Sequence, residues 1–151
     1  MAGADDIFLV QKSDYPEIIE VWESSVRATH HFLSEEDIQY FKPLILNQYL
    51  DAVTLFCTKD SDGRITGFGG IADGKIEMLF VHADDRGKSY GKILLRHAMS
   101  EFDALKVDVN EQNEQAVGFY EHMGFEVISR SPLDSLGKPF PLLHMQYLRH
   151  N

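Results

Sequence analysis

The sequence predicts an α/β (α+β) fold, with a mixed central sheet of about six to seven strands flanked by about four helices. Two observations support this prediction. Apolar residues recur at helical spacing in both halves of the chain, and between those halves three apolar runs are separated by short Asp/Gly turns. No repeat, low-complexity tract or Pro/Gly/Ser-rich linker interrupts the chain, so we expect a single domain over residues 1–151.

The N-terminal part predicts a strand followed by a helix. Ile7–Val10 is a short apolar run typical of a strand. Asp14 followed by Glu17 predicts a capping box that opens the helix, with Pro16 in its first turn. The residues expected on its buried face are Ile18, Trp22 and Val26.

A second helix should begin at Ser34, because Asp37 stands three residues later. Pro43 should kink or split this helix, since proline lacks a backbone N–H and its ring clashes with the preceding turn. The apolar residues that keep the helical period are Ile38, Phe41, Ile45 and Tyr49.

From residue 53 the pattern changes to strands, over Val53–Thr58, Ile65–Ala72 and Lys75–Val81. Residues 60–63 (Asp-Ser-Asp-Gly) and 73–74 (Asp-Gly) are hairpin sequences, so the three strands should form an antiparallel meander. A helix over Ser89–Phe102, a strand over Leu105–Val109, a helix from Asn113 to Met123 ended by Gly124, and strands over Phe125–Ser129 and Leu142–Leu148 should follow. The inner side of the first of these helices should carry Ile93, Leu94, His97 and Ala98.

Composition restricts the possible partners. The chain has 24 acidic and 14 basic residues and a formal charge of −10, which argues against nucleic acid and weakly favours a cationic amine. No apolar run approaches the roughly 20 residues of a membrane helix, and the N-terminus does not resemble a signal peptide. Cys57 is the only cysteine, which fits a reducing compartment. We therefore expect a cytoplasmic protein without a membrane partner.

The most informative segment joins a strand to a helix at residues 86–91. A glycine-containing turn before a helix presents unpaired N–H groups and the positive end of the helix dipole, which together bind phosphate or pyrophosphate. Arg86, Lys88 and Lys92 add positive charge. A nucleotide-binding P-loop would need a glycine five positions before Gly87, where this chain has His82, so that interpretation is rejected.

Residues 86–91 (Arg-Gly-Lys-Ser-Tyr-Gly) resemble the Arg/Gln-x-x-Gly-x-Gly/Ala signature of the GNAT superfamily of N-acetyltransferases. Ser89 replaces the usual middle glycine, and we expect it in the first helical turn, where its hydroxyl can replace a contact. Residues 113–125 (Asn-Glu-Gln-Ala-Val-Gly-Phe-Tyr-Glu-His-Met-Gly-Phe) match the family's Asn-x-x-Ala-x-x-Phe-Tyr-x-x-x-Gly-Phe at every named position. The amino-acid sequences of residues 28–33 and 137–143 are similar to those of the bacterial YjaB-type branch of the family.

The resemblance implies direct transfer of an acetyl group from acetyl-CoA to a primary amine in a ternary complex. It implies that Tyr120 protonates the leaving thiolate and that Glu77 accepts the amine proton, directly or through water. A backbone N–H of Leu79, Phe80 or Val81 should bind the thioester oxygen, and this strand should also hold the pantetheine arm. The other residues expected to bind acetyl-CoA are Arg86, Gly87, Lys88, Ser89, Tyr90, Gly91, Lys92, Asn113 and Phe119, together with Tyr120.

The acceptor remains open between a small-molecule amine and a peptidyl lysine. The residues that could line its site are His30, His31, Trp22 and His144. We expect no metal, because the two adjacent histidines lack partners at metal-ligand spacing, and we expect Cys57 to be buried rather than nucleophilic. The alternative function is a non-catalytic acyl-CoA-binding regulatory module, and both a monomer and a homodimer are compatible with the sequence.

Overall fold

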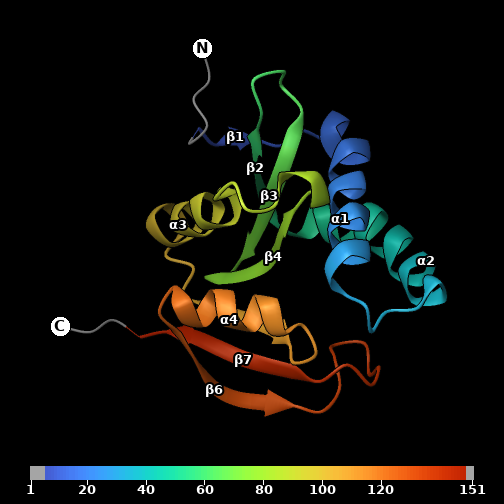
Figure 1. The fold of residues 1–151 in the computed structure, drawn as a ribbon, viewed down its shortest axis with the longest axis vertical. Helices are drawn as coiled ribbons and strands as arrows, with labels where there is room; N and C mark the ends of the chain where they lie inside the picture. Colours follow the sequence, from blue (N-terminus) through green and yellow to red (C-terminus); the bar gives the residue numbers. More distant parts are fainter. Residues whose placement is uncertain (1–5, 149–151) are drawn as a thin grey trace.

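The computed structural model describes residues 6–148 and contains one seven-stranded sheet with the order β1-β2-β3-β4-β5-β7-β6 (Figure 1). Neighbouring strands are antiparallel except β4 and β5, which are parallel, so the sheet is mixed as predicted. The strands are β1 Phe8–Leu9, β2 Thr54–Lys59, β3 Ile65–Ala72, β4 Lys75–Val81, β5 Lys106–Asn110, β6 Phe125–Ser131 and β7 Leu142–Tyr147. Residues 1–5 and 149–151 of the predicted domain lie outside the described part of the chain.

Four α-helices cover the sheet, as predicted (Figure 1). They are α1 Tyr15–Thr29, α2 Glu35–Leu44, α3 Tyr90–Phe102 and α4 Glu114–His122. Short 3₁₀ turns occupy Lys12–Asp14, Leu50–Ala52 and Ala83–Asp85, and a π-helical turn occupies Ile45–Tyr49. The π turn directly follows the last turn of α2, which contains Pro43, so the predicted interruption of that helix is confirmed.

Two cores form on opposite faces of the sheet. The first packs α1 and α2 against one face of β2, β3 and β4, and the second packs α3 and α4 against the other face. The alternation along β2 illustrates the division, since Leu55 and Cys57 belong to the first core and Phe56 to the second. On α3, the predicted Leu94 and Ala98 are fully buried.

Both helices start where predicted, with Asp14 and Ser34 as their N-caps, but only one of the two predicted capping boxes forms. Ser34 and Asp37 form the expected capping box, with the Ser34 N–H donating to Asp37 at 3.0 Å and the Asp37 N–H donating to Ser34 at 3.1 Å. The box predicted between Asp14 and Glu17 does not form. The Asp14 carboxylate instead accepts from the Gln11 N–H, and Glu17 accepts from the Ile65 N–H at 2.8 Å, tying α1 to the start of β3.

The three strands β2, β3 and β4 form the predicted antiparallel meander, and β4 then separates from β5 on its other side. Only Lys75 and Ile76 of β4 pair with β5. On the other side of β4 the pairing with β3 shifts between Ile76 and Met78, so Glu77 is the extra residue of a β-bulge. Because the bulge lies where the β4–β5 pairing stops, the sheet opens between these two strands.

Candidate active site

A cavity of about 480 Å³ occupies the opening between β4 and β5. It reaches both faces of the sheet, since Leu79 and Val81 belong to the α3/α4 side and Met78 and Phe80 to the α1/α2 side. Its wall is made by the residues of β4 from Ile76 onward, those of β5 from Val107 onward, the end of α1, the loop before α3, and α4. The arrangement gives two reactants access to one point from opposite faces of the sheet.

The edge of β4 that faces the cavity carries free backbone donors. In an antiparallel ladder, residues that point N–H at the partner strand alternate with residues that point it away. The His82 N–H donates to the Thr66 carbonyl at 2.8 Å, so the N–H of Phe80, two residues earlier, also points toward β3. The N–H groups of Leu79 and Val81 point the other way, toward the open side of β4. Of the three predicted donors, Phe80 is therefore excluded, and Leu79 and Val81 are the groups available to a ligand.

The loop before α3 needs left-handed backbone at two positions. Gly87 has φ +79° and Ser89, the N-cap of α3, has φ +69°. The expectation that Ser89 lies in the first helical turn is thus wrong, because the helix begins one residue later, at Tyr90. A left-handed backbone is the conformation for which glycine is favoured, which explains the glycine usual at this position.

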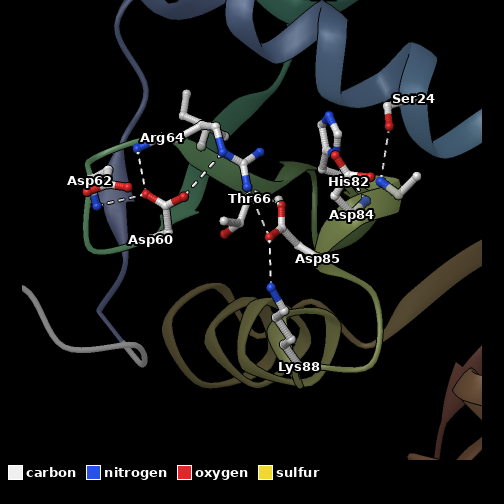
Figure 2. Close-up of polar contacts among 12 residues, drawn as sticks. Ser24, Asp60, Asp62, Arg64, Thr66, His82, Asp84, Asp85 and Lys88 are labelled. Carbon is white, nitrogen blue, oxygen red and sulfur yellow. Dashed lines mark hydrogen bonds and ion pairs between the residues drawn. The ribbon is translucent and has the colours of Figure 1, made fainter.

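Neighbouring elements hold this loop in place. The Ser24 hydroxyl of α1 accepts from the Ala83 N–H at 3.0 Å (Figure 2). At its other end, the Arg86 guanidinium donates to the side-chain carbonyl of Gln115 in the first turn of α4. The loop is therefore fastened to both α1 and α4, and the N-termini of α3 and α4 border the same cavity.

Most of the predicted loop residues line the cavity, namely Arg86, Gly87, Ser89, Tyr90, Gly91 and Lys92. Gly91 leaves open space, since an added Cβ would meet nothing closer than 3.7 Å, from the Phe119 ring. Lys88 is outside the lining, and its ammonium lies 3.5 Å from the Asp85 carboxylate. Whether Lys88 contacts the cofactor stays a prediction.

Tyr120 and Glu77 both line the cavity, from α4 and β4 respectively. Tyr120 is 6% exposed, and burial raises the pKa of its hydroxyl above the ordinary value of about 10. The hydroxyl has no hydrogen-bond partner among residues 6–148. Every fully buried side-chain polar atom in that range does have a partner, so the Tyr120 oxygen is not fully buried and is accessible from the cavity that Tyr120 lines. Glu77 is exposed at the bulge. A protonated phenol and an accessible carboxylate are thus available at one cavity.

Asn113 and His30 meet across the cavity. The Asn113 side-chain oxygen caps α4 by accepting from the Ala116 N–H at 3.2 Å, and its nitrogen lies 3.4 Å from His30 Nε2. Thr29 donates its hydroxyl hydrogen to the Ser25 carbonyl, so His30 Nδ1, 2.7 Å from that hydroxyl, must be the donor. Burial, with a smaller contribution from the charge of His31, lowers the pKa of His30 to about 4. His30 is therefore a neutral imidazole whose Nε2 accepts.

The other predicted acceptor residues do not line the cavity. Trp22 is 4% exposed within the core of α1, so its assignment to the acceptor site is wrong; its spacing from Ile18 and Val26 places it on the buried face. His31 is exposed. His144 lies between two partners, with Nδ1 2.6 Å from the Asp108 carboxylate and Nε2 2.6 Å from the Ser131 hydroxyl.

Cys57 is fully buried, and burial raises the pKa of its thiol to about 11, so at neutral pH it is a thiol rather than a thiolate nucleophile. Within residues 6–148 no three His, Cys, Asp or Glu side chains gather as a metal-binding group. No helix in the same range is both long and apolar enough to cross a membrane.

Residues 29–147 match the acetyltransferase (GNAT) domain family. The chain is also 40% identical over 132 residues to the peptidyl-lysine N-acetyltransferase YjaB of Escherichia coli K12, covering 87% of this chain and 89% of that protein. The chain belongs to the GNAT acetyltransferase family. The fold agrees with the solution structure of apo YjaB from Escherichia coli, with a TM-score of 0.87, 37% identity, and coverage of 96% and 98% of the two chains.

A second solved structure extends the comparison of the fold. The PaiA N-acetyltransferase from Thermoplasma acidophilum, determined in complex with coenzyme A, aligns with a TM-score of 0.71 at 23% identity, covering 94% of this chain and 98% of that one. As a GNAT N-acetyltransferase, this chain takes its acetyl group from acetyl-CoA. The free N–H groups of β4, the left-handed loop and the space beside Gly91 fit such a donor.

Some residues that line the cavity were not identified from sequence. Gln115 lies two residues after the predicted cap Asn113, and that spacing could have placed it at the cavity. Asp85, Asp108 and Thr29 also line the cavity. Of these, Asp85 directly precedes the predicted loop, and a carboxylate beside an anion site could have indicated a nearby cation.

Proposed function

We propose that this chain acetylates the side-chain amine of peptidyl lysine, with the donor on the α3/α4 side of the sheet and the acceptor on the α1/α2 side. The observation that carries this proposal is the cavity that passes between β4 and β5 and contains both Tyr120 and Glu77. Lysine as the acceptor is supported by the 40% identical relative, which is named a peptidyl-lysine N-acetyltransferase.

Acetyl-CoA supplies a thioester whose carbonyl carbon is attacked by the neutral amine, forming the C–N bond and breaking the C–S bond. An amine of pKa about 10 is mostly protonated at neutral pH, so Glu77 accepts its proton, directly or through water. Tyr120 donates its hydroxyl proton to the departing sulfur. The N–H of Leu79 or Val81 donates to the carbonyl oxygen as negative charge develops there.

The binding residues have separate tasks. The loop from Arg86 to Gly91 holds the pyrophosphate with its N–H groups and the Arg86 charge. The edge of β4 pairs with the pantetheine arm as an added strand would. His30 borders the acceptor side, where its neutral imidazole can accept a hydrogen bond from an amine.

The experiment is a transfer assay with purified protein, acetyl-CoA, a lysine-containing peptide and spermidine, read by thiol release and by mass spectrometry of the products. We expect acetylation of the peptide lysine in preference to spermidine, and a large loss of kcat in Glu77→Gln. Transfer to spermidine alone would replace the lysine proposal with a small-molecule acceptor. Binding of acetyl-CoA without transfer to either acceptor would favour a non-catalytic module.

We also infer a cytoplasmic location and action without nucleic acid. The formal charge of −10 and the single, buried, unpaired Cys57 support this inference. Monomer and homodimer can be distinguished by sedimentation, and the proposed site uses residues of one chain only.

A further inference from the structure

A buried carboxylate lies directly beside the proposed pyrophosphate loop. Asp85 is 2% exposed and precedes Arg86 in the chain. A carboxylate in this position is costly to bury without a counter-ion, and its negative charge would repel a pyrophosphate. The surroundings of Asp85 therefore affect both the stability of the loop and its affinity for an anion.

Two cations approach this carboxylate from opposite sides (Figure 2). Arg64, at the end of the β2–β3 hairpin, places Nη2 2.9 Å from Oδ2 and 3.1 Å from Oδ1 of Asp85. Lys88 places its ammonium 3.5 Å from Oδ1. The Arg64 contacts are thus the closer ones, and Lys88, with a side chain 59% exposed, is the looser partner.

Arg64 is itself held in position by the hairpin. The Asp60 carboxylate accepts from the backbone N–H groups of Asp62 and Arg64 at 2.9 and 3.0 Å, and it lies 3.2 Å from Arg64 Nε. The guanidinium is therefore oriented before it meets Asp85. An oriented guanidinium loses less side-chain freedom on pairing than a flexible ammonium does.

We propose that Arg64 is a positioning residue for acetyl-CoA binding: it neutralises Asp85 and so leaves Lys88 available to a phosphate of the cofactor. Without Arg64, Lys88 is the remaining counter-ion near Asp85, and its present 3.5 Å contact with the carboxylate tightens, which draws the ammonium away from the ligand. This proposal rests on the placement of the pyrophosphate at residues 86–91. It assigns Arg64 a role although it does not line the cavity.

The test is a double-mutant cycle on the acetyl-CoA Kd, measured by calorimetry with Arg64→Ala, Lys88→Ala and the double variant. We expect each single variant to raise the Kd about tenfold, the loss typical of one hydrogen bond to a charged group. The double variant should be no weaker than Arg64→Ala, because Lys88 no longer reaches the cofactor once Arg64 is gone. Additive losses, or an unchanged Kd in Lys88→Ala, would overturn the proposal.

Further variants separate this role from simple loss of structure. Arg64→Ala/Asp85→Asn should recover the wild-type Kd, since a neutral side chain needs no counter-ion. S-acetylpantetheine, which lacks the phosphates, should bind Arg64→Ala as it binds wild type; an equal loss for both ligands would show a structural defect and contradict the proposal. Arg96→Ala, which removes an exposed guanidinium outside the cavity, is the control.

The same measurements distinguish failure of this inference from failure of the site. If Arg86→Ala weakens acetyl-CoA binding and Lys88→Ala does not, only the role of Arg64 is contradicted. If neither variant changes the Kd, the pyrophosphate does not bind at residues 86–91, and the placement of the donor in the proposed function fails together with the role of Arg64.

Discussion

Ser89 is the residue at which this chain departs most clearly from the family signature, and the structure gives the departure a physical meaning. A non-glycine residue in the left-handed region costs roughly 1–2 kcal/mol, which glycine does not incur. Serine at φ +69° thus carries backbone strain in the loop that is proposed to bind the pyrophosphate.

We predict that Ser89→Gly stabilises the protein by about 0.5 kcal/mol, because relief of strain exceeds the extra freedom that glycine gives the unfolded chain. The same change at the exposed, helical Ser100 should destabilise by about 0.5 kcal/mol. Urea unfolding of both variants measures these effects. Equal destabilisation at the two sites would show that Ser89 is not left-handed in solution.

Tyr120 allows a prediction about chemistry rather than stability. Tyr120→Phe should lower kcat about 100-fold, as expected for loss of a general acid, while the acetyl-CoA Kd changes by no more than about twofold. Since burial raises the pKa of Tyr120, the hydroxyl stays protonated past its ordinary value, and the alkaline fall in wild-type kcat should lie above about pH 10. Tyr49→Phe, which is outside the cavity, serves as the control. An unchanged kcat in Tyr120→Phe would remove Tyr120 from the reaction.

At the scale of elements, the site depends on helix α3 approaching the ligand with its backbone. Gly91→Ala adds a methyl group that makes only ordinary contacts in the protein, the nearest at 3.7 Å. We therefore expect its stability to rise by about 0.5–1 kcal/mol, as for glycine replacement in a helix, while the Kd for acetyl-CoA rises about tenfold through contact with the ligand.

Gly118→Ala is the matched control, because this helical glycine on α4 has nothing within 4 Å of an added Cβ and lies outside the cavity lining. It should gain similar stability with no change in Kd, as measured by thermal unfolding and calorimetry. If both variants bind acetyl-CoA as wild type does, the pyrophosphate does not contact the start of α3.

Local sequence signals predicted the helices, strands and turns well. They could not predict contacts between residues that are far apart in the sequence. The hairpin sequences, the Ser34 cap and Gly124, whose φ is +99°, each act over a few residues and were correctly identified. The Asp14–Glu17 box was wrong because Glu17 is used by the Ile65 N–H, 48 residues away. No sequence pattern reports such a partner.

The residues of the candidate site also divide into those that local motifs predicted and those that depend on distant contacts. The motifs located Tyr120 and most of the loop residues that line the cavity. The choice of Leu79 and Val81 over Phe80 needed the strand register, and the contact between Arg64 and Asp85 joins residues 21 positions apart. The helical spacing correctly placed Trp22 on the buried face of α1, and only its additional assignment to the acceptor site was wrong.

At the scale of the whole molecule, the partly buried His30 should make stability depend on pH. Its pKa is lowered to about 4 in the folded state from about 6.5 when unfolded, so between these values the unfolded chain binds more protons. Stability is therefore lost as pH falls, by about 2 kcal/mol between pH 7 and pH 5. The carboxylates whose pKa is lowered in the folded state, such as Glu35 and Asp108, lose their contribution to stability mainly below their unfolded pKa of about 4, outside the range from pH 7 to pH 5.

We predict that His30→Gln removes most of this dependence, while the exposed His122→Gln keeps it, as measured by urea unfolding at pH 7 and pH 5. An identical pH dependence in wild type and His30→Gln would show that His30 is not held neutral by burial.

The central claim concerns where the donor lies relative to the sheet, and a crystal structure with acetyl-CoA tests it most directly. The predicted result has the pyrophosphate at residues 86–91, the pantetheine arm bonded to the N–H groups of Leu79 and Val81, and the thioester between β4 and β5 near Tyr120. A pyrophosphate bound elsewhere, or an arm on the α1/α2 side of the sheet, would contradict it.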